Sequence, residues 1–164
     1  MADKPITNAE ARARVTELVK ESRICMLTTT ADDGSQVSRP MGLQDSEFDG
    51  ILWFFSLADA DVAKQVQARP QVNVSFANPK ATTWVSIAGT ATQEFDKGKA
   101  SLLWTSYLEP WFPDGIETPG LTLIRVQART AEWWDPPGVM GHAKAVMTGK
   151  NAGPGVHRQV EYPA

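Results

Sequence analysis

Short runs of apolar and β-branched residues, each followed by turn residues, dominate the pattern along the chain. Such runs are typical of β-strands, in which successive side chains point to opposite faces. The pattern predicts six strands, at about residues 24–30, 35–41, 51–56, 72–76, 82–95 and 121–134. Residues 31–34, Ala-Asp-Asp-Gly, supply turn chemistry between the first two strands, which are therefore expected to form an antiparallel hairpin.

Two of these strands have features of their own. Residues 51–56 read ILWFFS, a run too apolar for a strand with one solvated face, so we expect this strand to be buried on both sides. Gly89 interrupts the strand at 82–95, and a glycine inside a strand pattern often marks a β-bulge.

Three segments have helical features. Asn8 can cap a helix over residues 9–22. A short helix is expected to begin at Asp59 or Asp61 and to end before Pro70, because the residue before a proline avoids the α region. A third helix is expected over residues 97–107, and the apolar residues expected to face inwards there are Leu102, Leu103 and Trp104.

These elements predict one α+β domain, mainly β, over residues 1–137. Its expected fold is a six-stranded antiparallel split β-barrel of Greek-key type with flanking helices. Residues 138–164 form a Gly-rich C-terminal tail with little periodicity, which we expect to be partly ordered or to depend on a partner.

Composition and charge disfavour several classes of protein. The net charge is −3 over 164 residues and no long run of Lys and Arg occurs, so nucleic-acid binding is not expected. The N-terminus lacks an apolar signal segment and no run is long enough for a membrane span, so we expect a cytoplasmic protein without membrane contact. The single cysteine, Cys25, and two histidines, His142 and His157, are too few to predict a metal site or a Cys–His nucleophile.

Three features together indicate a site for a phosphate-bearing aromatic cofactor. Arg39, Pro40 and Met41 stand at the end of a predicted strand, and Ser56 precedes a predicted helix. An arginine fork, a hydroxyl and free N–H groups at a helix start can all bind phosphate. Trp and Phe side chains can form the walls of a pocket for a flat ring. Trp111 and Phe112 lie in a stiff loop between Pro110 and Pro113, where they are not both expected to enter the core of their own domain.

Seven motifs in order resemble the general stress protein branch of the pyridoxamine 5'-phosphate oxidase-like family. They are RPM at 39–41, GILWFFS at 50–56, PQVNVSF at 70–76, VSIAGTA at 85–91, LW at 103–104, WFPDG at 111–115 and EWW at 132–134. The resemblance covers roughly residues 8–137. It implies a split-barrel homodimer with two FMN molecules at the interface, each contacted by both chains.

Cofactor contacts follow from this resemblance by position. One strand is implied to run beside the flavin, the next to reach the ring and phosphate, a third to approach from the interface, and the aromatic loop to cover the flavin from the partner chain. The strand beside the flavin contributes Arg39, Pro40 and Met41, and the strand that reaches the ring and phosphate contributes Phe54, Phe55 and Ser56. The strand at the interface contributes Trp84 and Ser86, and the covering loop contributes Trp111, Phe112 and Pro113. Lys64 is a further candidate.

The chain departs from the family pattern at two places. Relatives commonly carry a phosphate-binding lysine where this chain has Val62. Lys64 lies two residues later, about 200° around a helix, so it cannot simply replace that lysine. True pyridoxamine phosphate oxidases have an arginine–histidine motif after their last strand, and His157-Arg158 comes too late to match it, so vitamin-B6 oxidation is not expected.

The function expected from the sequence is that of an FMN-binding general stress protein acting as an oxidoreductase, with NAD(P)H as a candidate electron donor and no assigned catalytic side chain. One alternative keeps the fold and replaces FMN by a deazaflavin or haem. Another is a non-enzymatic flavin store, sensor or binding protein, which needs the same pocket without electron throughput.

Overall fold

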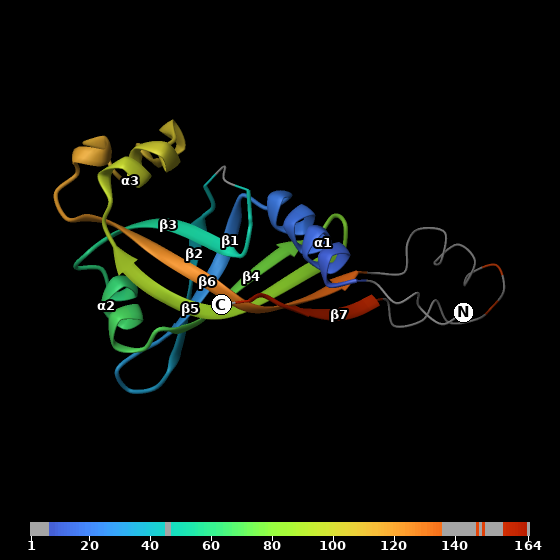
Figure 1. The fold of residues 1–164 in the computed structure, drawn as a ribbon. Coiled ribbons are helices and arrows are strands. Elements are labelled where there is room, and N and C mark those ends of the chain that lie inside the picture. The colour runs from blue at the N-terminus through green and yellow to red at the C-terminus, as the bar shows by residue number, and fades with distance from the viewer. Residues whose placement is uncertain (1–6, 45–46, 136–146, 148, 150–155, 164) are drawn as a thin grey trace.

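The computed structural model describes residues 7–44, 47–135, 147, 149 and 156–163, which contain one mainly antiparallel sheet, three α-helices and two 3-10 turns (Figure 1). The helical elements are α1 (Asn8–Lys20), α2 (Asp61–Ala68), α3 (Lys97–Leu103), η1 (Ser106–Leu108) and η2 (Gly115–Glu117). The strands are β1 (Ile24–Thr30), β2 (Gln36–Gly42), β3 (Ile51–Leu57), β4 (Gln71–Asn78), β5 (Thr83–Glu94), β6 (Leu121–Asp135) and β7 (Val156–Glu161).

All seven strands belong to one sheet with the order β2-β1-β4-β5-β6-β3, and β7 pairs with β6. Every pairing is antiparallel. The sheet is open, because β2 and β3 are its two edges and approach each other without pairing. The mainly-β α+β class is thus confirmed, and the predicted count of six strands is wrong: the seventh comes from the tail, whose residues 156–161 pair with the last strand of the domain.

The strand predictions agree closely with the structure. The Ala-Asp-Asp-Gly turn joins β1 and β2 into the expected hairpin, in which Thr30 lies opposite Gln36. The bulge predicted at Gly89 is confirmed, since the register between β5 and β6 shifts at Ala88 and Gly89. A methyl group on Gly89 would meet the carbonyl oxygen of Gln127, so the two strands approach too closely there for any larger residue.

The ends of the helices differ from the predictions. Thr7, not Asn8, caps α1, because its hydroxyl accepts the Glu10 N–H while the Glu10 carboxylate accepts the Thr7 N–H. The second helix begins at Asp61, which confirms one of its two predicted starts. The third helix ends at Leu103 rather than at 107, and Leu102 is exposed instead of facing inwards, because the short helix buries only Ala100 and Leu103.

Apolar side chains form two clusters on opposite sides of β3. The larger one packs α1 and α2 against the sheet and contains Phe54 and Trp133. The smaller one lies under α3, η1 and η2 and contains Phe55 and Phe112. Successive residues of β3 therefore enter different clusters, which confirms that this strand is buried on both sides.

Helix α1 lies at one end of the sheet with β7, while α2 and α3 lie at the other end (Figure 1). Arg14 on α1 donates to the Asp135 carboxylate at the end of β6, at 2.9 Å. Arg12 donates to the carbonyl of Glu161 on β7, at 2.7 Å. These contacts tie the N-terminal helix to the last two strands. Among the described residues, no helix is both long and apolar enough to cross a membrane.

Candidate functional site

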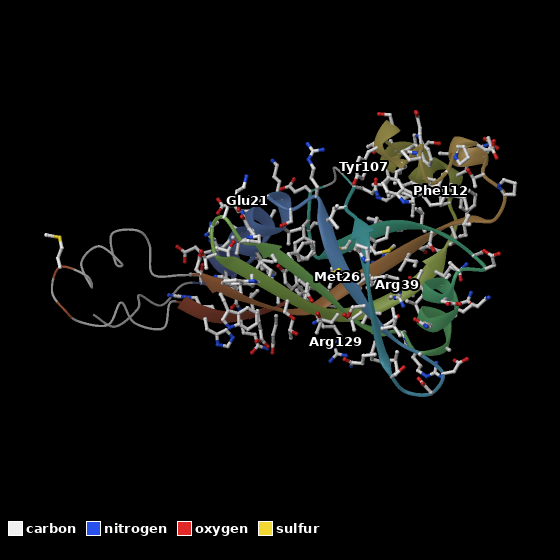
Figure 2. The ribbon with its side chains drawn as sticks, turned by 180° about the vertical axis from the view of Figure 1, so that it is seen from behind. Glu21, Met26, Arg39, Tyr107, Phe112 and Arg129 are labelled. Atoms are coloured by element: carbon white, nitrogen blue, oxygen red, sulfur yellow. The ribbon has the colours of Figure 1, made fainter. Side chains whose placement is uncertain are left out.

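Arg39 is held in place at the edge of the sheet beside α2 (Figure 2). One guanidinium nitrogen donates to the Thr29 hydroxyl on β1 at 2.7 Å, and another donates to Gln65 Oε1 on α2 at 2.9 Å. The Thr29 hydroxyl itself donates to Gln65 Oε1. The planar guanidinium is thereby oriented by two elements before any ligand arrives.

The electrostatic surroundings of Arg39 have two opposing parts. Burial lowers the pKa of Arg39, while the nearby carboxylate of Asp61 acts in the other direction. Asp61 is the first residue of α2, and the N–H groups of residues 61–63 have no hydrogen-bond partner within the described part of the chain. A fixed arginine and three unpaired N–H groups make this corner suitable for an anion, although Asp61 competes for the same positive charge.

Val62 and Lys64 face different directions on α2. Val62 is buried in the larger cluster, and Lys64 is exposed. This difference agrees with the rotation of about 200° between the two positions. The helix thus turns the position of the expected lysine into the core, and Arg39 is the cation that packs against α2 by hydrogen bonds.

Several predicted contact residues on β2 and β3 are committed to their own chain. Phe54 and Phe55 are buried in the two apolar clusters, so any cofactor contact by them has to come from the backbone. Ser56 is also buried, and its hydroxyl donates to the carbonyl of Leu57 at 3.2 Å. Met41 packs on the larger cluster, whereas Pro40 is exposed.

Trp84 and Ser86 lie on the outer face of the sheet, which no helix of the described chain covers. A row of paired residues crosses this face from Ala77 through Trp84 and Trp134 to His157. Trp84 is 43% exposed and Trp134 is 38% exposed. His157 stacks on Trp134 with ring centroids 5.0 Å apart, so the row forms a broad aromatic strip.

The rest of the outer face is apolar at one corner and polar in the middle. Ile24 and Met26 of β1 are exposed there. Asn73 donates to Ser86 at 2.8 Å, and the hydroxyls of Thr28 and Ser38 are 2.7 Å apart. An exposed face of large apolar side chains around internally paired polar groups is typical of a protein interface.

The aromatic loop packs with α3 and β3, and its Phe112 lies apart from Arg39 (Figure 2). Phe112 is buried and packs against Phe55 and Trp104, with ring centroids 6.3 Å away in each case. Trp111 is 61% exposed and contacts the Tyr107 ring in a tilted arrangement, with centroids 5.4 Å apart, and Pro113 is exposed. Only Trp111 and Pro113 are therefore available to contact another molecule, while Phe112 holds the loop to its own chain.

The predicted site residues do not converge within one chain. The structure groups Arg39 with α2, the pair Trp84 and Ser86 on the outer face, and Trp111 in its loop, while the buried Ser56 hydroxyl donates to its neighbour Leu57. The role of Thr29 and Gln65 as supports of Arg39 was missed. The hairpin register could have indicated Thr29, since Leu27 pairs with Arg39 and Thr29 is two residues along on the same face. No signal in the sequence indicated Gln65.

No group of three or more His, Cys, Asp and Glu side chains that could hold a metal ion occurs in the part of the chain that the structure describes. Burial raises the pKa of the Cys25 thiol to about 12, which makes it a poor nucleophile.

Comparison with protein families matches residues 10–153 to the family described as "Pyridoxamine 5'-phosphate oxidase like". Comparison with curated proteins finds no match. Among solved structures, a protein of Jannaschia sp. CCS1, proposed to be general stress protein 26, is 21% identical with a TM-score of 0.78, covering 94% of this chain and 99% of that one. General stress protein 26 of Bacillus anthracis is 19% identical with a TM-score of 0.67. The match covers 76% of this chain and 93% of that one.

A third similar structure is the general stress FMN/FAD binding protein of Xanthomonas citri, which is 26% identical with a TM-score of 0.67 and covers 77% of this chain and 89% of that one. The family match over residues 10–153 confirms the pyridoxamine 5'-phosphate oxidase-like family that the seven sequence motifs indicated, and the solved structures show the same fold.

Proposed function

Because the chain belongs to the pyridoxamine 5'-phosphate oxidase-like family, we propose that it is an FMN-binding general stress protein that holds the flavin between two copies of the chain. The observation that carries this proposal is the Arg39 guanidinium, which Thr29 and Gln65 hold beside the unpaired N–H groups of α2. The similarity to the FMN/FAD binding protein of Xanthomonas citri supports the choice of a flavin.

The residues at this corner fit a phosphate group. Arg39 supplies a directed positive charge, and the first turn of α2 supplies N–H donors. Ser56 is not needed for this site, because its hydroxyl is buried and donates to the carbonyl of Leu57. When bound, a flavin supplies reversible two-electron redox chemistry. The chain then binds the phosphate, orients the ring and limits its exposure to water.

A second copy is required by the same proposal, because the three groups of candidate residues do not meet within one chain. The outer face, with its aromatic strip from Trp84 to His157, is the proposed interface. The exposed Trp111 and Pro113 are proposed to reach the flavin of the other copy.

Titration of the purified protein with FMN tests the cofactor, with flavin fluorescence and absorption as readouts. We expect a bound flavin and a native mass of two chains with two FMN. Arg39→Gln should weaken FMN binding about 10- to 100-fold, whereas Asp61→Asn should tighten it by removing the competing carboxylate. Lys80→Gln, which removes an exposed charge in the β4–β5 turn, is the matched control and should change nothing.

Unchanged FMN affinity in the Arg39 variant would exclude this phosphate site, and a colourless wild-type protein that leaves FMN fluorescence unquenched would exclude the cofactor. NAD(P)H oxidation with an added acceptor then tests enzymatic activity. A rate no higher than that of free FMN would identify a flavin-binding protein without turnover.

A further inference from the structure

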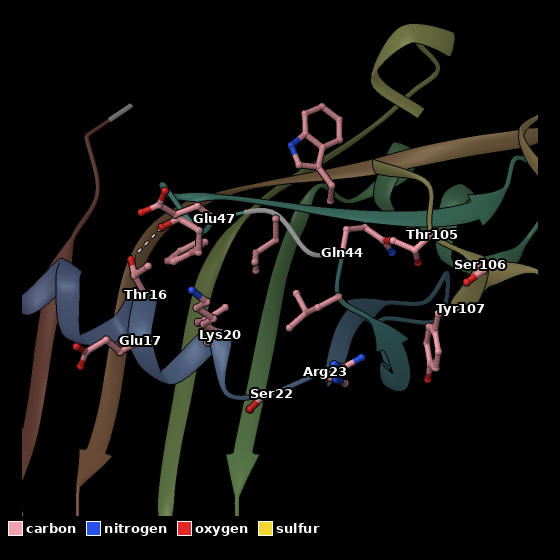
Figure 3. A pocket seen from close by; sticks show the side chains of 15 residues that line it. Thr16, Glu17, Lys20, Ser22, Arg23, Gln44, Glu47, Thr105, Ser106 and Tyr107 are labelled. Carbon is pink, nitrogen blue, oxygen red and sulfur yellow. Dashed lines mark hydrogen bonds between the residues drawn. The ribbon is translucent and has the colours of Figure 1, made fainter. Parts of the chain in front are cut away.

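A cavity, here called the α1–η1 cavity, lies away from Arg39. It has a volume of about 880 Å³ and is bounded by the end of α1, the segment after β2, the start of β3 and the η1 turn (Figure 3). This volume lies in the range of about 300–1,000 Å³ that is usual for small-molecule sites. Neither Arg39, Ser56 nor any residue of α2 lines it.

One wall of the α1–η1 cavity is apolar. Val19, Phe48 and Leu52 belong to the larger core cluster and line the cavity from α1 and from both sides of the turn before β3. Leu43 packs against the same cluster and also lines the cavity. A bound molecule can therefore bury an aliphatic or aromatic part here without displacing charged groups.

Two cations line the same cavity. Lys20 ends α1 and Arg23 follows it, and within the described residues neither side chain takes part in an ion pair. Of the carboxylates that also line the cavity, Glu17 is paired with Arg14 at 3.0 Å. Glu47 lies toward Thr16, whereas Arg23 lies toward Tyr107 (Figure 3). Positive charge thus remains available at the η1 end.

Gln44 adds a buried polar group to this wall. Its side chain is only 8% exposed, yet its single hydrogen bond within the described residues is a long one of 3.3 Å from Nε2 to the carbonyl of Gly42. An amide has two N–H donors and one acceptor oxygen, so Gln44 can form further hydrogen bonds with a ligand. The hydroxyl-bearing residues Thr105 and Ser106 line the cavity near it (Figure 3).

We propose that the α1–η1 cavity binds a small organic carboxylate with an apolar body. The apolar wall takes the body, Lys20 and Arg23 attract the carboxylate, and the Gln44 amide provides a directed hydrogen bond. Leu43 and Gln44 directly follow the strand of Arg39, and Leu52 precedes Phe54 on β3. The cavity and the Arg39 corner are thus connected through β2 and β3, and the cavity proposal does not rest on the proposed function. Binding itself does not require FMN.

The test is calorimetric titration of the full chain, free of flavin, with 4-phenylbutyrate and with its neutral amide, 4-phenylbutyramide. We expect phenylbutyrate to bind with a Kd of about 1 mM or tighter. The doubly substituted Lys20→Gln, Arg23→Gln chain should bind it about tenfold more weakly and bind the amide unchanged. Lys80→Gln should affect neither ligand. Both substituted side chains are exposed, so the fold should persist, as circular dichroism can show.

The site is located independently by the side-chain amide signals of Gln44 in nitrogen–proton correlation spectra, which should shift when phenylbutyrate is added. The proposal is overturned if phenylbutyrate does not bind, if the double substitution weakens acid and amide equally, or if the shifts lie outside the cavity. Since no flavin is present, these outcomes are independent of the FMN titration, and each proposal can fail alone.

Discussion

Gly89 is the position where the structure predicts the sharpest response to adding one methyl group. In Gly89→Ala the new Cβ would collide with the carbonyl oxygen of Gln127, at 3.0 Å from its carbonyl carbon and 3.3 Å from the Cα of Ala128. All three atoms are backbone atoms of β6, which is paired on both edges, so they cannot move as a flexible side chain would.

The expected loss of stability is the difference between two effects. Overpacking of this kind typically costs about 1–3 kcal/mol. Replacing glycine by alanine also restricts the unfolded chain, which stabilises the fold by about 0.4–1 kcal/mol. The collision involves the centre of the sheet beside the buried Ile87 and Ala91, so overpacking should dominate. We expect a net loss of about 1–2 kcal/mol, or a Tm lower by about 2–8 °C for a chain of this size.

Urea unfolding followed by tryptophan fluorescence and thermal unfolding followed by circular dichroism measure this loss. Gly42→Ala is the matched control, because Gly42 also lies in a strand and its Cβ would be 3.6 Å from the Tyr107 ring, an ordinary contact. The control should stay within about 0.5 kcal/mol of the wild type. If Gly89→Ala is no less stable than Gly42→Ala, the close approach at the bulge is not rigid and the reasoning is refuted.

Two further predictions concern buried side chains. Because burial raises the pKa of Cys25 from 9.0 to about 12, the folded thiol stays protonated where the unfolded one ionises. The protonated thiol therefore makes its full contribution to the free energy of unfolding below about pH 9, and this contribution decreases as the pH rises toward 12. At pH 10 the decrease is about 1.4 kcal/mol. Cys25→Ala should therefore lose less stability between pH 8 and 10 than the wild type in urea unfolding, and parallel decreases would contradict this. In the same unfolding assay, Phe112→Ala should lower the free energy of unfolding by about 3 kcal/mol, because its side chain is buried. Trp111→Ala should lower it by less than about 1 kcal/mol, because its side chain is exposed. Similar losses for the two variants would show that the loop packs differently.

Local patterns along the chain were sufficient for most of the secondary structure. The pattern of residues 24–30 and the turn after them predict a hairpin. The structure contains this hairpin, and its first strand, β1, has the predicted ends. A glycine inside a strand pattern indicated the bulge. Period-two alternation and turn chemistry involve only neighbouring residues, so such features can be recognised without knowing what packs against them.

The candidate site was predicted only in part. Arg39 was identified from the family motifs, and the structure places it beside α2. The expectation that it stands at a strand end is wrong, because it lies in the middle of β2 (Gln36–Gly42). Its supports could not be found in this way, because Gln65 comes from a helix separated from β2 by a loop and a strand. The resemblance implied that Phe112 contacts the flavin of the partner chain, but the smaller cluster buries its side chain. The loop sequence does not contain the surface that Phe112 packs against.

By itself, the sequence determined the mainly-β class, the bulge at Gly89 and the family. Only the tertiary structure decided that a strand from the tail pairs with β6, that β2 and β3 remain unpaired edges, and that α1, β3 and η1 enclose a cavity lined by Lys20, Arg23 and Gln44. The physical reason is the range of the interactions. Strand and turn propensities act between near neighbours, whereas edge pairing, burial and cavities depend on which distant segments the packed core brings together.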